Sequence, residues 1–219
     1  MLRLDLPPRG ALAPNSDVDP LKFYYAPLVG RVFVARINLG LALLDGRRAE
    51  RLLEIGFGSG LLLPTLARIA DRVDGVDLAS DPAAVRASVE RLGVNNLGEL
   101  VRGDARALPL PDGSYDAVVA FSILEHLKPH ELDAALGEAA RVLRPGGRFL
   151  VGCPAVHKGM NLAFAAIGFR GIEDHHFSAI GDVIAASQQR GFSVEKCATW
   201  PRGVPLGWAP YNAVLLRRS

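Results

Sequence analysis

The sequence predicts an α/β fold, a three-layer sandwich around a mostly parallel seven-stranded sheet with one antiparallel strand near the edge. From Arg51 onward, short apolar segments alternate with segments of helical periodicity, which is typical of a parallel sheet covered on both faces. Two late strand-like segments follow each other without a helix between them, which favours a hairpin and hence an antiparallel strand. The 219 residues, 49% hydrophobic and 22% charged, suit one domain with a large core.

Residues 1–46 are expected to form a helical cap or lid ahead of the sheet, which occupies residues 47–219. Apolar side chains recur at helical spacing between Leu28 and Leu44, and Pro27 suits the first turn of a helix. The cap helix is expected to stop at Asp45-Gly46. Its apolar surface is larger than a solvated tail needs, so we expect the segment Leu2 to Leu44 to act as a lid.

The strands and helices of the main domain follow in order along the sequence. Apolar segments predict strands near residues 51–55, 73–77, 100–102, 115–121, 148–152, 192–198 and 212–217. Helices are expected over residues 59–70, after Ser80-Asp81-Pro82, and over residues 129–143 and 178–190. Asp81 suits the N-cap position and Pro82 the first helical position.

Composition excludes several classes of protein. The formal net charge is +2 and the 25 basic residues are scattered, so no nucleic-acid partner is expected. The most apolar stretch, residues 23–44, is interrupted by Pro27 and Arg36, so no integral membrane segment is expected. No secretory signal is recognised, and Cys153 and Cys197 cannot form a disulfide framework, which indicates a cytoplasmic protein. The sequence is compatible with a monomer or a homodimer.

The segment Glu54-Ile55-Gly56-Phe57-Gly58-Ser59-Gly60 lies between an expected strand and an expected helix. Glycine adopts positive φ and lets a ligand approach the backbone closely. A dinucleotide-binding turn has the spacing G-x-G-x-x-G, which would place its third glycine at Leu61. Glu54, two positions before Gly56, suits a ligand with an ammonium group better than one with a pyrophosphate. The segment therefore favours S-adenosylmethionine over a dinucleotide.

With these residues in place, the sequence over about residues 48–217 resembles the class I S-adenosylmethionine-dependent methyltransferases that have a type 11-like, small-molecule domain. Further motifs agree in order and spacing, namely Asp77-Leu78, Gly103-Asp104-Ala105, Ser114-Tyr115-Asp116-Ala117-Val118 and Arg141-Val142-Leu143-Arg144-Pro145-Gly146-Gly147. Several ordered motifs are more specific than one glycine-rich turn.

The resemblance implies roles in binding the donor, whose product is S-adenosylhomocysteine. Asp77 is expected to bind the ribose hydroxyls, Leu78 to pack on adenine, and Asp104 to meet the adenine amino group. The expected donor-binding residues are Glu54, Gly56, Gly58, Gly60, Asp77, Leu78, Asp104, Ala105, Phe121 and Ser122, of which the last two lie beside the methionine portion.

His126 is the candidate catalytic residue, a general base for an acceptor that must lose a proton. It follows the fourth strand, at the carboxyl end where such sheets bind ligands, and it resembles the histidine of the family's Glu-His-Leu segment. The alternative is that Glu125 and His126 only order the loop. Methyl transfer from a sulfonium depends mainly on alignment, so we expect no histidine to be strictly required.

The acceptor side is expected to include Tyr25 of the cap, together with His175 and His176. These histidines border an insertion near residues 154–176, where relatives build the acceptor pocket. A structural or lid role for both histidines stays open. The metal-ligand residue types near the site lack a short, closed zinc spacing, so no metal is expected.

The expected function is methyl transfer from S-adenosylmethionine to a small, apolar or aromatic acceptor by in-line displacement. One alternative is a donor-binding pseudo-enzyme or binding protein. A second is a nicotinamide-dependent oxidoreductase, against which Leu61 counts. A macromolecular acceptor is a third, but Ala120-Phe121-Ser122-Ile123 occupies the place of the aromatic-Pro-Pro-Tyr loop of nucleic-acid amino methyltransferases.

Overall fold

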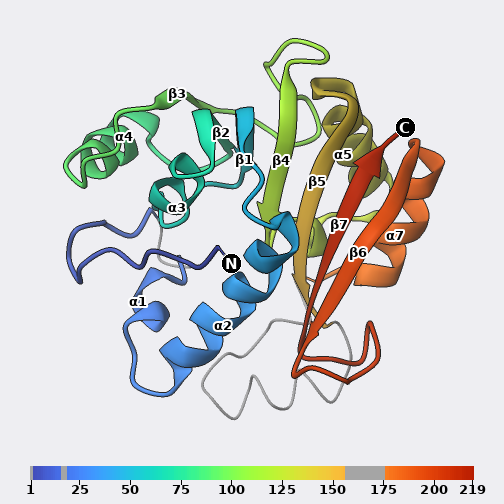
Figure 1. The fold of residues 1–219 in the computed structure, drawn as a ribbon, viewed down its shortest axis with the longest axis horizontal. Coiled ribbons are helices and arrows are strands. Elements are labelled where there is room, and N and C mark those ends of the chain that lie inside the picture. Colours follow the sequence, from blue (N-terminus) through green and yellow to red (C-terminus); the bar gives the residue numbers. More distant parts are fainter. Residues whose placement is uncertain (1, 16–18, 156–175) are drawn as a thin grey trace.

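The computed structural model describes residues 2–15, 19–155 and 176–219, which form a seven-stranded sheet (Figure 1). The strand order is β3-β2-β1-β4-β5-β7-β6. β7 runs antiparallel to β5 and β6, and the other neighbouring pairs are parallel, which confirms the predicted fold class. The strands are β1 (Ala49–Ile55), β2 (Ala70–Asp77), β3 (Leu97–Arg102), β4 (Tyr115–Phe121), β5 (Leu143–Pro154), β6 (Phe192–Trp200) and β7 (Tyr211–Arg218).

Helices cover both faces of this sheet (Figure 1). One buried apolar cluster joins the first face to α2, η1, α3 and α4, and a second joins the other face to α5 and α7. The helices are α1 (Leu21–Tyr24), α2 (Val29–Leu41), η1 (Ala42–Leu44), α3 (Leu63–Ala67), α4 (Pro82–Glu90), η2 (Leu124–His126), α5 (Pro129–Val142) and α7 (Ile180–Gln189). Within the described ranges, every helix is too short or too polar to cross a bilayer.

The order of the strands places a ligand site beside β1. β1 pairs with β2 on one side and with β4 on the other, so the direction of strand order reverses there. In parallel α/β sheets, such a reversal opens a crevice at the carboxyl ends of the two strands. The glycine-rich turn leaves β1 at this point.

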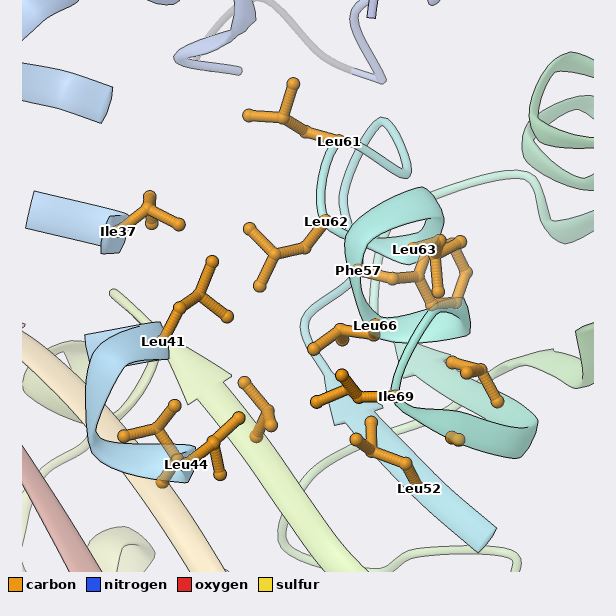
Figure 2. Packing of buried hydrophobic residues seen from close by; sticks show 14 of the residues in the cluster. Ile37, Leu41, Leu44, Leu52, Phe57, Leu61, Leu62, Leu63, Leu66 and Ile69 are labelled. Carbon is orange, nitrogen blue, oxygen red and sulfur yellow. The ribbon is translucent and has the colours of Figure 1, made fainter. Parts of the chain in front are cut away.

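The N-terminal cap shares the main core. Figure 2 shows Ile37 and Leu41 of α2 pointing toward Leu62, which directly precedes α3, and toward Leu66 of α3. Leu52 of β1 lies below them. Leu41, Leu52 and Leu66 are fully buried. Burying one such side chain stabilises the fold by about 1.5–3 kcal/mol. α2 is therefore held firmly against the first face of the sheet.

The chain before α1 lies along the same side of the molecule (Figure 1). The Asp5 amide donates a hydrogen bond to Thr65 Oγ1 at 2.9 Å. The Asn15 side chain donates to Ser80 Oγ at 2.7 Å, just before α4. These bonds attach the cap to α3 and to the loop that precedes α4.

The helix expected over residues 59–70 is shorter in the structure, where α3 spans only Leu63–Ala67. Gly58 and Gly60 have φ of +51° and +83°, which a right-handed helix cannot contain. The helix therefore begins after the turn, and Ala70 already belongs to β2. The expected Asp81 cap is confirmed, because its Oδ1 accepts hydrogen bonds from the amides of Ala83 and Ala84.

Candidate active site

A cavity of about 520 Å³ opens at the carboxyl ends of β1, β2 and β4. The turn after β1, the end of β2 and the loop after β4 line it together with the cap. Of the residues predicted from the sequence, it is lined by Glu54, Gly56, Gly58, Asp77, Leu78, Asp104, Ala105, Phe121, Ser122 and His126. Residues that are far apart in the sequence are thus brought to one cavity.

Backbone hydrogen bonds, one to β2 and one within the turn, fix the glycine-rich turn. The Gly56 amide donates to the Val76 carbonyl at 2.7 Å, and the Gly60 amide donates to the Phe57 carbonyl at 2.7 Å. Gly56 has φ +79°, and a Cβ at this position would lie 2.2 Å from Ile123 Cδ1. Gly56 therefore keeps the turn close to the loop after β4, and a side chain there would be both strained and crowded.

Gly60 lies outside the cavity lining and packs against α4. A Cβ on Gly60 would lie 2.7 Å from Val85 Cγ1 and 2.9 Å from Val89 Cγ2, and its φ is +83°. The close contact sets the distance between the turn and α4. Gly60 therefore shapes the turn through its contact with α4 and not by lining the cavity.

Asp77 ends β2 and connects the two loops that border the cavity. Its Oδ1 accepts hydrogen bonds from the amides of Ala79 and Ser80 at 2.9 and 2.8 Å and from Ser80 Oγ at 2.7 Å. Its Oδ2 accepts one bond, from the Gly58 amide at 2.9 Å. The carboxylate is thus pre-oriented, and Oδ2 keeps acceptor capacity toward the cavity.

Glu54 supplies a second, less satisfied carboxyl group. Its side chain is buried, and Oε2 has no hydrogen-bond partner within the described residues. Burial, together with the nearby negative charge of Asp77, raises the pKa of Glu54 to about 8. A cationic group placed beside Glu54 would stabilise its ionised form.

The edge of the cavity near β2 and β3 carries Leu78, Asp104 and Ala105. The Leu78 side chain is 63% exposed, which leaves an apolar surface open for a flat ligand group. Arg106 forms an ion pair with Asp104 at 2.6 Å, and its hydrogen bonds hold the pKa of Asp104 below its ordinary range. Asp104 is therefore available as an ionised acceptor at this edge.

The loop after β4 forms the opposite wall. Ser122 has φ +56°, and its amide donates to the Gly152 carbonyl at 2.8 Å. Phe121 packs against α2, since a Cβ on Gly40 would lie 2.6 Å from its ring. Ser122 Oγ is buried without a hydrogen-bond partner among the described residues. This wall therefore combines an apolar ring with a buried hydroxyl.

Sequence reasoning missed Arg36 of α2, which lines the cavity. Its guanidinium carbon lies 4.0 Å from the ring centroid of Phe33 and 5.5 Å from that of Tyr211. Nη2 donates to Tyr24 Oη at 3.3 Å, and Nε is buried without a partner among the described residues. The sequence signal for Arg36 was a charged residue within the apolar face of the cap helix. Sequence reasoning used Arg36 only as evidence against a membrane-spanning segment.

The acceptor-side residues lie in different places. His126 lines the cavity, and His176 lies beside it with ring centroids 4.9 Å apart. Tyr25 lines a separate surface cavity between α1 and α2, and its hydroxyl donates to the Pro7 carbonyl at 2.9 Å. Its neighbour Tyr24 lines the main cavity. His175 and most of the insertion near 154–176 lie outside the described residues.

A family model described as a methyltransferase domain matches residues 53–151. The chain is similar to a phosphatidylethanolamine N-methyltransferase from Cereibacter sphaeroides, with 38% identity over 106 residues, which are 48% of this chain and 50% of that protein. It is also similar to a ubiquinone biosynthesis O-methyltransferase from Bradyrhizobium sp. (strain ORS 278), with 32% identity over 145 residues, 66% of this chain and 54% of that protein.

A solved structure has the same fold. The N-methyltransferase NodS from Bradyrhizobium japonicum WM9, in complex with S-adenosyl-L-homocysteine, has a TM-score of 0.66 and 16% identity, with 93% of this chain and 94% of NodS covered. Among the curated relatives, the chain spans between 32% and 54% of their own length. The matching family model and these relatives agree with the glycine-rich turn: residues 53–151 match a methyltransferase domain, and the chain is similar to S-adenosylmethionine-dependent methyltransferases.

Proposed function

We propose that the protein transfers a methyl group from S-adenosylmethionine to a small, apolar or aromatic acceptor. The observation that carries this proposal is the buried Glu54 carboxyl, which has an unpartnered oxygen beside the glycine-rich turn. The ammonium group of a methionine portion would supply the missing positive charge. A pyrophosphate would bring no positive charge to Glu54 and would be repelled by the negative charge of Asp77.

Arg36 completes the fit to an amino-acid portion. The ammonium and carboxylate of methionine carry opposite charges. Glu54, which ionises when it pairs with the ammonium, and Arg36 would offer the matching opposite charges in the same cavity. Within the described residues, no carboxylate forms an ion pair with Arg36. An anionic ligand group would therefore find a buried guanidinium with a free Nε.

The remaining donor contacts follow the order of the strands. We assign the ribose to Asp77, whose Oδ2 keeps acceptor capacity, and adenine to the edge with Leu78, Asp104 and Ala105. Gly56 and Gly58 let the methionine portion approach the backbone, with Phe121 and Ser122 opposite. Gly60 contributes by packing against α4.

The reaction is an in-line displacement. A lone pair of the acceptor forms a bond to the methyl carbon, and the sulfur–carbon bond breaks with its electron pair going to sulfur, which becomes a neutral thioether. Alignment of the two partners supplies about 7–11 kcal/mol in well-oriented reactions. His126, which lines the cavity, would accept a proton from an O–H or N–H acceptor, which is worth about 10²–10⁴-fold in rate.

The apolar wall supports an apolar or aromatic acceptor. Ile37, Phe121 and Ile123 line the same cavity as His126. One relative is named as a phosphatidylethanolamine N-methyltransferase and another as a ubiquinone biosynthesis O-methyltransferase. Phospholipids and ubiquinone both have large apolar parts. A lipid-like or quinol-like acceptor is therefore the first class to test.

The test is transfer of a labelled methyl group from S-adenosylmethionine to a panel of quinols, phenols, fatty acids and aminophospholipids. We expect labelled product and S-adenosylhomocysteine to form together and to depend on one acceptor class. Gly56→Ala should abolish transfer, because its Cβ would lie 2.2 Å from Ile123. Gly181→Ala is the matched control, since nothing lies within 4 Å of its Cβ position. Donor binding without transfer to any acceptor, or label only in protein or nucleic acid, would contradict the proposal.

A further inference from the structure

The Arg106 side chain clamps the Asp104 carboxylate, although Arg106 does not itself line the cavity. Its Nε lies 2.9 Å from Oδ1 and 3.0 Å from Oδ2, and its Nη2 lies 2.6 Å from Oδ2. The Arg106 backbone amide also donates to Oδ1, at 2.8 Å. A two-point contact between a guanidinium and a carboxylate fixes the orientation of the carboxylate, which a single hydrogen bond does not.

This clamp leaves the Asp104 carboxylate with about one acceptor position. An ionised carboxylate has about four lone-pair positions and no donor of its own. The Arg106 amide, Nε and Nη2 supply three donors to it. Because the Asp104 side chain is 29% exposed and lines the cavity, the remaining position is open to a ligand. That position accepts a hydrogen bond and cannot donate one.

The Arg106 guanidinium is held on its other side by α5. Nη1 forms an ion pair with Glu131 Oε1, and Glu131 Oε2 accepts a hydrogen bond from the Lys128 amide at 2.9 Å, directly before that helix. Exposed ion pairs contribute little to stability, and the Arg106 side chain is 40% exposed. The arrangement therefore suits a role in orienting Asp104 better than a role in stabilising the fold.

We propose that Arg106 is a positioning residue that makes the donor site selective for a 6-aminopurine over a 6-oxopurine. The inference rests on the proposed function, which assigns adenine to the edge with Asp104. One N–H of the exocyclic amine matches the single open acceptor position on Asp104. A 6-oxopurine would place a carbonyl oxygen there, and two acceptors would face each other without a proton between them.

Loss of the Arg106 guanidinium is expected to relax this selectivity. The Asp104 side chain would then be free to turn about its own torsions, since only the backbone amide of residue 106 would still hold Oδ1. A carboxylate that turns would accept the N1–H of a 6-oxopurine almost as well as the exocyclic N–H of adenine. The two purines would therefore bind with more similar affinity.

The test is calorimetric titration with S-adenosylhomocysteine and with its 6-oxo analogue, S-inosylhomocysteine. The wild type should bind S-adenosylhomocysteine about 10–150-fold more tightly, the range for one hydrogen bond to a charged group. Arg106→Gln should lower this ratio about fivefold or more, because members of one ion-pair network couple on that scale. Arg106→Lys should lower it as well, since lysine keeps the charge without the planar two-point contact.

Two further variants separate orientation of Asp104 from a general effect on the protein. Arg190→Gln is the matched control, because it removes another exposed guanidinium–carboxylate pair, with Asp133 of α5, away from the cavity lining. Its ratio and its melting temperature should equal those of the wild type. In an Asp104→Ala background, Arg106→Gln should cause no further loss of selectivity, because Arg106 acts through Asp104.

An unchanged ratio in both Arg106 variants would overturn the proposal, and so would a loss in Arg106→Gln that persists in the Asp104→Ala background. A wild type that binds both compounds equally would also overturn it, while leaving donor binding itself intact. A wild type that binds neither compound would instead contradict the proposed function, and with it this role of Arg106.

Discussion

Glu54→Gln tests the electrostatic basis of donor recognition. In the ligand-free protein, burial and the charge of Asp77 raise the pKa of Glu54 to about 8, so the carboxyl holds a proton at neutral pH. Pairing with the donor ammonium requires the ionised form. Binding below pH 8 should therefore release one proton, and the affinity should rise with pH.

The size of the effect follows from the pKa. Below the pKa, the affinity rises tenfold for each pH unit, because each unit corresponds to about 1.36 kcal/mol. Between about pH 6 and about pH 8 the dissociation constant for S-adenosylhomocysteine should fall about 50-fold, or about 2.3 kcal/mol, with little change above pH 8. Gln carries no proton to release, so the affinity of Glu54→Gln should be independent of pH and weaker at pH 8 by about 1.5–3 kcal/mol.

The assay is calorimetric titration in buffers of different ionisation enthalpy, which counts the protons released. Glu50→Gln is the matched control, because Glu50 lies on the same strand with a 74% exposed side chain. It should keep the pH dependence of the wild type. A wild-type affinity that stays constant between pH 6 and pH 8, with no proton released, would refute this account of Glu54.

The other predictions concern the turn, the cap and the base. Asp77→Ala should weaken S-adenosylhomocysteine binding by about 1.5–3 kcal/mol. Its control, Asp81→Ala, should lower the free energy of unfolding by about 0.5–2 kcal/mol without changing that affinity. If Asp77→Ala binds S-adenosylhomocysteine as tightly as the wild type does, the ribose is bound by other residues. Hydrogen exchange in residues 2–44 should slow when donor binds, and full protection without ligand would make the cap a fixed part of the core. His126→Ala should reduce single-turnover methylation by less than about 10⁴-fold, and a loss of that size with intact donor affinity would identify an essential base.

The sequence was sufficient where the signals are local. Asp81 and Pro82 predict the start of α4, and alternation of apolar segments predicts the sheet, because capping and periodicity depend on neighbours along the chain. The loop residues at the ends of β1, β2 and β4 converge as expected, since parallel strands end at one edge.

Other features depend on tertiary contacts and were missed. The helix after Gly60 is shorter than its periodicity suggested, because successive glycines with positive φ precede it. Arg36 faces the cavity only because α2 packs against β7 and Tyr211. Arg106 pairs with Glu131 only because the fold brings the loop after β3 to the start of α5. These contacts join residues of different segments, so no residue spacing within one segment predicts them.

Calorimetric titration of the purified protein with S-adenosylhomocysteine and, separately, with NADH distinguishes a methyl-donor site from a dinucleotide site. We expect one equivalent of S-adenosylhomocysteine to bind and to raise the melting temperature, because a ligand that binds only the native state stabilises it. NADH should give neither effect, since its pyrophosphate would face Glu54 and Asp77. No response to millimolar S-adenosylhomocysteine, together with saturable binding of NADH, would contradict the assignment of this cavity to the methyl donor.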